Sequence, residues 1–271
     1  MSTCRRSCLA LPFTALTMIL AAGSAACGPT INPVDVSPSD ASGDATPLGN
    51  ITIAFAHTVH GVPLMLGTAT PYTNAAGNSF GVTRVSYFVS NLTLNLRDGR
   101  SVSAPGAHYV DVDTPTTMRL AFPGDVPTGD LASISFVMGL PPALDVTGMF
   151  SSPPESLMEW PVMMGGGYHH MKFEGRYVNS AGQPYGFMAH SGGLDYVDYS
   201  FPVTLDAAGR TMTGSAVTFT LQMDLAEWFT NPSTWDLNDY FNATHPGIMD
   251  DAVALASLRA NGASVFSLGA P

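Results

Sequence analysis

Hydrophobic and polar residues alternate along most of the chain after residue 50. The alternation is clear in "NITIAFAH" (50–57), "HYVDVD" (108–113) and "YHHMKFEGRYV" (168–178). A period of two is typical of β-strands with one buried face. Short alternating runs separated by Gly- and Pro-rich turns predict an all-β fold, namely an antiparallel β-sandwich.

Helical periodicity is scarce. The segment "DDAVALASLRAN" (250–261) is the best helix candidate, and Asp224–Phe229 is expected to begin a short helix. The tetrapeptide "RDGR" (97–100) between two alternating runs predicts a hairpin turn. We therefore expect one β-sandwich domain with a few short helices over residues 51–271.

The first 50 residues have a different character. Arg5 and Arg6 precede an apolar run from Leu9 to Ala22, and the small residues "AAGSAA" follow, which is the pattern of a secretory signal over residues 1–26. Cys27 then matches the acylated cysteine of a bacterial lipoprotein, with simple cleavage after Ala26 as the alternative. Residues 27–50, rich in Pro, Ser, Asp and Gly, are expected to form the anchor and a flexible linker. We therefore expect a protein that is exported to the periplasm or cell surface and anchored to a membrane by a lipid.

Composition limits the partners and the metal ligands that this chain can have. The formal net charge is -11 and the charged fraction is only 11%, so a nucleic-acid partner is not expected. Cys4 and Cys8 lie in the signal, which leaves Cys27 as the mature chain's cysteine. Disulfides, thiolate metal sites and a cysteine nucleophile are thereby excluded. Any metal must be held by His, Met, carboxylate or a group made after translation.

Four histidines stand where loops meet predicted strands. His57 and His60 frame the end of the first strand, His190 ends a strand before a Gly pair, and His245 lies in a loop with Pro. Strand ends beside flexible loops are where ligands at a binding rim are expected. Each histidine taken singly is more often a hydrogen-bonded or exposed side chain, and only the set as a whole suggests a metal site.

Methionines surround Trp160 in "MEWPVMMGGGYHHM" (158–171), beginning with Met158, and Met188 lies two residues before His190. Thioether and imidazole ligands together favour Cu(I), whereas methionine as a filler of core gaps is the alternative. Strand alternation places His169 and His170 on opposite faces. The two can therefore bind one metal only if the strand is bulged.

Catalytic signatures are missing from the sequence. It contains no phosphate-binding loop, no zinc-protease HExxH motif and no GxSxG nucleophile elbow. Asp111 and Asp113 share a predicted strand face and could support a hydrolase, but turn carboxylates are the commoner role of such residues. We therefore do not expect an enzyme.

Several segments together resemble the MbnP-like family of periplasmic proteins, which are encoded beside methanobactin genes and more widely in bacteria. They include "FAHTVHGVPLMLG" (55–67), "GGYHHMKFEG" (166–175), "FMAHSGG" (187–193) and "DLAEWF" (224–229), and they follow the family's order and spacing. The motif "YFVSN" (87–91), Tyr168 followed by "KFEG" (172–175), and the histidines at 57 and 190 match the family pattern.

The resemblance implies a β-sandwich that binds copper for uptake or handling. It also implies a partner, a MauG-like di-haem cytochrome c peroxidase, which oxidises a Trp to kynurenine that ligates copper together with His. The family often has Trp-x-Trp before the Gly-Tyr strand, whereas here Trp160 stands alone at a longer spacing. The expected metal ligands are His57 and His190 first, His245 and Trp160 next, and Met158 and His60 after them. Tyr168 and Glu174 are expected to orient the imidazoles. A metal-free surface interaction or adhesion module is the alternative function.

Overall fold

The computed structural model describes residues 48–124, 126–194 and 197–270. The expected signal (1–26), the expected lipidation site Cys27 and most of the linker lie outside these residues. Within the described part, no helix is both long and apolar enough to cross a membrane. The description that follows concerns only the β-rich unit that begins at Leu48.

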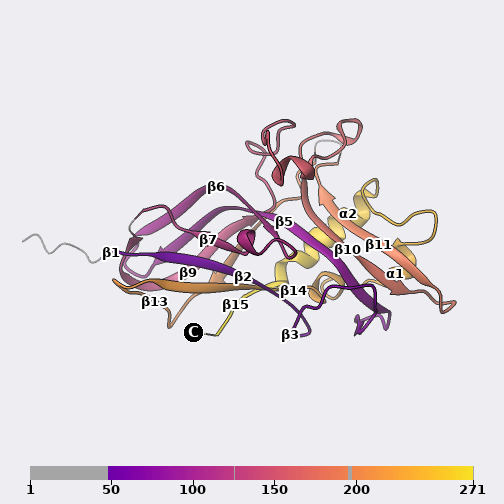
Figure 1. Ribbon diagram of the computed structural model, residues 1–271, viewed down its shortest axis with the longest axis horizontal. Helices are drawn as coiled ribbons and strands as arrows, with labels where there is room; N and C mark the ends of the chain where they lie inside the picture. The colour runs from indigo at the N-terminus through magenta and orange to yellow at the C-terminus, as the bar shows by residue number, and fades with distance from the viewer. Residues whose placement is uncertain (1–47, 125, 195–196, 271) are drawn as a thin grey trace, which may run out of the picture. The chain divides into compact units, whose positions relative to one another are not determined.

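Strand β5 (Ser79–Leu96) is the centre of the larger sheet (Figure 1). One of its edges pairs with β6 (Ser101–Asp111), and its other edge pairs first with β10 (His169–Val178) and then with β9 (Gly129–Met138). Strand β11 (Pro184–Gly192) continues the sheet beyond β10, and β12 (Phe201–Asp206) continues it beyond β9. All of these pairings are antiparallel. The short strands β4 (Tyr72–Thr73) and β13 (Thr211–Met212) pair with β5 and β9.

The smaller sheet has the order β15 (Phe266–Leu268), β14 (Val217–Asp224), β2 (Ile51–Val59) and β3 (Val62–Pro63), with β7 (Arg119–Ala121) also paired to β2. The pairing of β14 with β2 is parallel. A separate ladder joins β1 (Leu48–Gly49) to β8 (Val126–Pro127), so ordered pairing starts just before the expected boundary at residue 51.

Helices are few and short among the described residues. They are α1 (Leu237–Tyr240), α2 (Ala252–Asn261) and the 3-10 turns η1 (Pro115–Met118), η2 (Glu155–Met158), η3 (Val162–Met164), η4 (Glu227–Phe229) and η5 (Gly262–Ser264). Helix α2 confirms the expected C-terminal helix. It begins after Asp251, whose side chain accepts hydrogen bonds from the backbone N–H groups of Val253 and Ala254.

The predicted antiparallel β-sandwich is confirmed, and so is the hairpin turn at 97–100 between β5 and β6. The segment 224–229 is a strand end followed by the single turn η4 rather than the start of a longer helix. Asp111 ends β6 and accepts hydrogen bonds from the Tyr109 hydroxyl and the Asp113 N–H. The two aspartates therefore shape a turn, as the commoner reading of "HYVDVD" expects.

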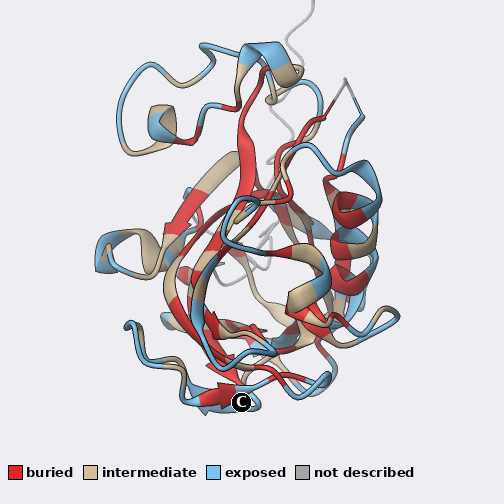
Figure 2. Ribbon diagram, turned by 90° about the vertical axis from the view of Figure 1, so that its right-hand side faces the viewer, coloured by how far each residue is buried: buried red, intermediate tan, exposed pale blue. Residues whose placement is uncertain are grey.

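Aromatic side chains join the two sheets. Phe266 of the smaller sheet contacts Phe136 and Tyr87 of the larger one, with ring centroids 5.0 and 6.4 Å apart, and Phe55 contacts Tyr87 at 6.5 Å. The buried positions follow the strands through the interior, while exposed positions gather on the loops (Figure 2). Burial of these rings is the main stabilising contribution to the sandwich.

A second, smaller core lies on the other face of β5. Residues 139–168, which we call the cap loop, connect β9 to β10 and stand at the top of Figure 1. Their apolar side chains pack on Phe88 and Tyr109 of the sheet, and Phe150 stacks on Phe88 with ring centroids 5.3 Å apart. Both faces of β5 are thus covered, which is why its sequence is apolar at consecutive positions rather than alternating.

Phe173 of β10 offers a test of the main core. It is fully buried between Phe187 and Phe229, each with its ring centroid 5.3 Å from that of Phe173. We expect Phe173→Ala to lower the free energy of unfolding by about 3–5 kcal/mol, because it removes a large apolar surface and leaves a cavity. The exposed Arg176 of the same strand is the control, and Arg176→Ala should change stability by less than about 0.5 kcal/mol in urea denaturation. Equal losses in the two variants would contradict this account of the core.

Candidate functional site

A bulge in β10 shapes the site. His169 lies opposite Gly192 and Met171 lies opposite Ser191, so His170 is an extra residue with no counterpart on β11. A bulge bends the strand and re-aims its side chains. The alternation expected from the sequence is therefore broken at this point. His169 turns toward the outer face of the sheet, where it meets His190, while Met171 stays in the core.

Three side chains gather on that outer face. The ring centroid of Trp160 lies 4.8 Å from that of His169, which lies 5.1 Å from that of His190, with interplanar angles of 62° and 83°. Their relative exposures are 1%, 6% and 7%. We call these residues the Trp–His–His cluster. They come from the cap loop, β10 and β11, which the bulge and the loop bring together.

Hydrogen bonds fix the orientation of His169. Its Nδ1 lies 2.9 Å from the carbonyl oxygen of Met158 and must donate to it, because a carbonyl only accepts. In a neutral ring this leaves the lone pair on Nε2. The Met158 sulfur in turn accepts from the hydroxyl of Ser86 at 3.6 Å. Met158 therefore contributes to the site through its backbone carbonyl, with its side chain held on β5.

His190 is oriented by a carboxylate. Its Nε2 donates to Oε1 of Glu174 at 2.9 Å, so the neutral ring carries its lone pair on Nδ1. The hydrogen bond from His190 lowers the pKa of Glu174, which also lies 3.9 Å from Arg84. The Nδ1 of His190 and the Nε1 of Trp160 are both buried, and neither has a hydrogen-bond partner among the described residues. Buried polar atoms without partners are rare in proteins and call for an explanation, such as a bound water or ion.

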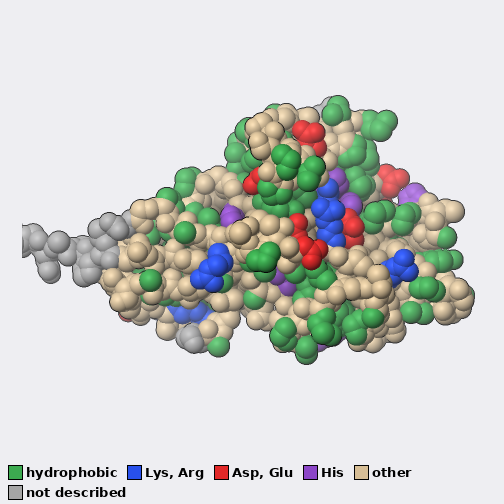
Figure 3. Space-filling model, viewed as in Figure 1, with side chains coloured by type: hydrophobic (Ala, Val, Ile, Leu, Met, Phe, Trp, Pro, Cys, Tyr) green, Lys and Arg blue, Asp and Glu red, His purple; other side chains and the backbone are tan. Residues whose placement is uncertain are grey.

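Electrostatics keeps His169 neutral. Burial, and then the positive charge of Lys172, lower its pKa to about 3. A neutral imidazole is the form that binds metal ions. On this face, basic and acidic side chains lie close together beneath the cap loop (Figure 3). Arg84, Lys172 and Glu174 thus place charges of both signs beside the cluster, while burial keeps His169 itself neutral.

Lys172 and a glycine hold Trp160 in place. The Lys172 ammonium donates to the Leu157 carbonyl at 2.8 Å, and the backbone N–H of Trp160 donates to the Gly167 carbonyl at 2.9 Å. The indole ring packs directly on Gly192 of β11. A Cβ at Gly192 would lie only 2.3 Å from Cε3 of Trp160. Only glycine at that position lets the indole lie against the strand.

The three glycines Gly165–Gly167 shape the end of the cap loop just before β10. Gly166 and Gly167 have φ angles of 72° and 79°, and a Cβ on Gly167 would lie 2.4 Å from Oδ1 of Asp145. Asp145 accepts hydrogen bonds from the Tyr168 N–H at 2.6 Å and from Nε2 of His170 at 3.1 Å. The three glycines therefore let the chain wrap around a carboxylate that ties the cap loop to β10.

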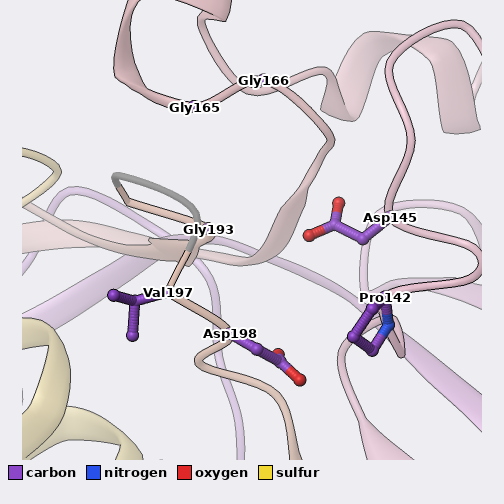
Figure 4. Close-up of a pocket in the computed structure, with 7 residues that line it drawn as sticks. All are labelled: Pro142, Asp145, Gly165, Gly166, Gly193, Val197 and Asp198. Atoms are coloured by element: carbon purple, nitrogen blue, oxygen red, sulfur yellow. The ribbon is translucent and has the colours of Figure 1, made fainter.

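A cavity of about 190 Å³ adjoins this tie, lined by Pro142, Asp145, Gly165, Gly166, Gly193, Val197 and Asp198 (Figure 4). The carboxylate of Asp145 points toward its centre. Both oxygens of Asp145 already accept hydrogen bonds, and Asp198 accepts from the Ser200 N–H at 2.7 Å. The cavity carboxylates thus stabilise the loops around them.

Comparison with known proteins agrees with this architecture. The MbnP family model matches residues 48–250. The chain belongs to the MbnP family. The solved structure of MbnP from Methylosinus trichosporium is similar, with a TM-score of 0.55 and 15% sequence identity over 81% of this chain and 98% of that one. At that identity the likeness concerns the fold. No curated protein matches the chain.

The family expectation is therefore confirmed, and the structure shows how its motifs are used. "KFEG" supplies the Lys172 tether and the Glu174 partner of His190. Tyr168, expected to orient an imidazole, instead packs in the smaller core, and its hydroxyl accepts from the Phe150 N–H at 2.8 Å. Of the two residues expected to orient imidazoles, only Glu174 does so.

The structure does not bring His57 and His190 together. His57 on β2 lies between the sheets, with Nε2 3.1 Å from the Tyr87 hydroxyl, and burial lowers its pKa to about 4. Tyr87 pairs with the core residue Met171, whereas His190 pairs with the next residue of β10. Because neighbouring strand residues face opposite sides, the larger sheet separates the two histidines.

His60 and His245 also lie apart from the cluster. His60 adopts a φ of 53°, donates its backbone N–H to Asp224 and contacts the Thr73 carbonyl through Nε2 at 2.7 Å. His245 is exposed in the loop after α1, with Nε2 3.3 Å from Asp250. Among the described residues, no group of three or more His, Cys, Asp and Glu is arranged to hold a metal ion. A metal at the cluster would therefore depend on two imidazoles and on atoms outside that set.

The hydrophobic pattern does not single out His169, because the bulge that re-aims this residue leaves no obvious mark in it. The three glycines before it were the available signal, since they imply an unusual backbone path into β10. Asp145 was missed entirely. It lies 25 residues from His170 and has no local motif around it.

Gly192→Ala tests the packing of the indole. We expect the added methyl group to displace Trp160, lower stability by about 1–3 kcal/mol and move the Trp160 indole N–H resonance in nitrogen-15 spectra. Gly193→Ala is a matched control, because its Cβ would meet no atom closer than 3.5 Å. Equal behaviour of the two variants would show that Trp160 does not rest on Gly192.

The buried imidazoles predict a pH dependence of stability. The pKa values of His57 and His169 are about 4 and 3 in the folded protein, against 6.5 when exposed. Between these values the unfolded chain binds more protons, so stability is complete above pH 6.5 and falls as the pH drops toward 4. Each histidine contributes up to about 1.4 kcal/mol per pH unit.

Urea denaturation of the metal-free protein at pH 7, 6 and 5 measures this slope. We expect His57→Gln and His169→Gln each to make the slope shallower. Curves parallel to that of the unsubstituted protein would mean that these rings are protonated in the folded state.

Proposed function

We propose that this chain is an exported copper-binding protein that takes up or handles copper through the Trp–His–His cluster. The observation that carries the proposal is the orientation of the two imidazoles. Met158 and Glu174 each occupy one nitrogen of a ring, which leaves the lone pairs of His169 Nε2 and His190 Nδ1 as metal ligands. Metal-binding histidines usually show this arrangement, with the second nitrogen donating to a carbonyl or carboxylate.

The donor set favours copper over harder ions. Two imidazole nitrogens as the metal ligands suit Cu(I), whereas Ca²⁺ and Mg²⁺ require several oxygen ligands. Because the cluster is buried, a monovalent ion costs less desolvation free energy there than a divalent one. Copper is the cargo in this proposal, so the chain itself needs no catalytic residues and acts as a binding protein rather than an enzyme.

Trp160 is the residue at which a further ligand could be made. We propose that a MauG-like di-haem peroxidase partner oxidises it to kynurenine. Two peroxide molecules would supply two oxygen atoms across the Cγ–Cδ1 bond and leave as two waters, and hydrolysis would then remove the formyl group as formate. The products of that cleavage are a ketone and an aromatic amine beside His169. The buried Nε1 without a partner would become the amine nitrogen.

In this proposal the protein is located in the cell envelope. The expected signal and acylated Cys27 would hold the domain at a membrane by a flexible linker, in the periplasm or at the cell surface. A protein in that position can capture copper outside the cytoplasm without any thiol ligand.

Cu(I) titration under reducing, oxygen-free conditions tests the site. We expect the protein to bind one tight equivalent, and His169→Ala or His190→Ala to abolish it. Glu174→Gln should weaken binding about 10–100-fold, because it removes the negative charge of the acceptor that orients His190. His60→Ala, an exposed histidine away from the cluster, is the control. Unchanged stoichiometry and affinity in both cluster variants would overturn the proposal.

Mass spectrometry of the protein from its native host tests the modification. A gain of about 4 mass units on the peptide with Trp160 would support kynurenine, since two oxygens are added and one carbon monoxide equivalent is lost. Unmodified Trp160 with bound copper would leave a site of two imidazoles. Absence of both copper and modification would favour the metal-free interaction module, for which the exposed side chains of Leu157, Val162 and Met163 on the cap loop would then be the contact surface.

A further inference from the structure

A second group of soft ligands lies outside the Trp–His–His cluster. An open cavity of about 420 Å³ is lined by Met164 of the cap loop and by the segment 244–250, which includes His245 and Met249. These two segments are about 80 residues apart in the sequence. The fold thus brings two thioethers and one imidazole to the wall of one cavity.

Met188 adds a third thioether to this neighbourhood. The Met188 N–H donates to the Pro246 carbonyl at 2.7 Å, and an isolated bridge joins Met188 to Gly247. The Met188 methyl carbon would lie 3.6 Å from a Cβ on Gly247, which itself lines the cavity. The loop that carries His245 is therefore fastened to β11 at Met188.

One ring nitrogen of the imidazole at this cavity contacts a carboxylate, as in His190. Nε2 of His245 lies 3.3 Å from Oδ1 of Asp250. A neutral ring that donates from Nε2 to a carboxylate carries its lone pair on Nδ1. Two thioethers and one imidazole form a ligand set that selects Cu(I) over zinc, calcium or magnesium.

The cavity also adjoins the inner cluster through two elements. Met164 follows Trp160 by four residues on the cap loop, and Met188 precedes His190 by two residues on β11. Positions two apart on a strand face the same side at a spacing of about 7 Å. Glu174, the partner of His190, lies opposite Met188 in the register. Met188 therefore lies on the same face of β11 as His190, about 7 Å along the strand.

We propose that Met164, His245 and Met249, with Met188 at the inner wall, form an outer Cu(I) site that loads the Trp–His–His cluster. This inference rests on the proposed function for its direction of transfer. The exposed outer site accepts the ion where a donor can reach it, because half the His245 side chain or more faces solvent. The buried imidazoles beside it then take the ion away from water.

The test uses the whole protein with Met methyl groups labelled with carbon-13 and Cu(I) as the probe. We expect a second, weaker equivalent of Cu(I) to shift the methyl resonances of Met164, Met188 and Met249. The triple variant Met164→Leu/Met249→Leu/His245→Asn should lose that equivalent and load the cluster at least about tenfold more slowly in stopped-flow mixing. Leucine conserves the volume of methionine, so the fold is retained.

Met163→Leu is the matched control. Met163 is the neighbour of Met164 and is 91% exposed, and it does not line the cavity. It should keep both copper equivalents and the loading rate. Unchanged stoichiometry and loading rate in the triple variant would overturn the outer site.

The two proposals fail separately in this experiment. If the triple variant still loads the inner imidazoles at full speed, the outer site is wrong and the copper function stands. If Cu(I) shifts the cavity methyl groups while His169→Ala/His190→Ala leaves copper binding unchanged, the outer site stands and the assignment of the cluster is wrong.

Discussion

One extra residue in β10 decides which side chains meet at the candidate site. Without the bulge at His170, regular alternation would place His169 in the core beside Met171 and Phe173. With it, His169 faces outward and meets His190. A bulge costs a ladder hydrogen bond, and here His170 compensates by bonding Asp145 of the cap loop. The same irregularity therefore presents one imidazole to the site and anchors the loop that covers it.

The cap loop is held by contacts that its composition alone does not suggest. The Gly165–Gly167 segment wraps around the carboxylate of Asp145, which accepts from the Tyr168 N–H. Lys172, the chain's one lysine, donates from β10 to a carbonyl of the cap loop. Trp160 is pressed against a bare glycine of β11. These contacts join the loop to both strands of the site, so the indole and the two imidazoles keep fixed relative positions. Preorganisation of this kind lowers the entropy cost of binding an ion.

The chain carries a formal net charge of -11, but its candidate site is built from one indole and two imidazole rings. Several carboxylates lie on turns and strand ends, where they accept hydrogen bonds from backbone N–H groups, as Asp111, Asp224 and Asp236 illustrate. The interior of the site instead holds His169, whose protonation is opposed by burial. The carboxylates thus stabilise turns, while the rings of the cluster are buried.

The sequence by itself determined the sandwich, its hairpin turn and its C-terminal helix, because side-chain alternation, turn residues and a capping aspartate act over a few neighbouring positions. It also determined the family, through motifs that lie within single strands, and it identified Trp160, Met158 and His190 as residues of interest. Only the tertiary structure decided which of them meet. His57 and His190 are separated by a sheet that local periodicity does not describe, and His169 joins His190 through a bulge whose stabilising partner, Asp145, is distant in sequence. Long-range pairing and register, which depend on the packing of the whole domain, set these positions.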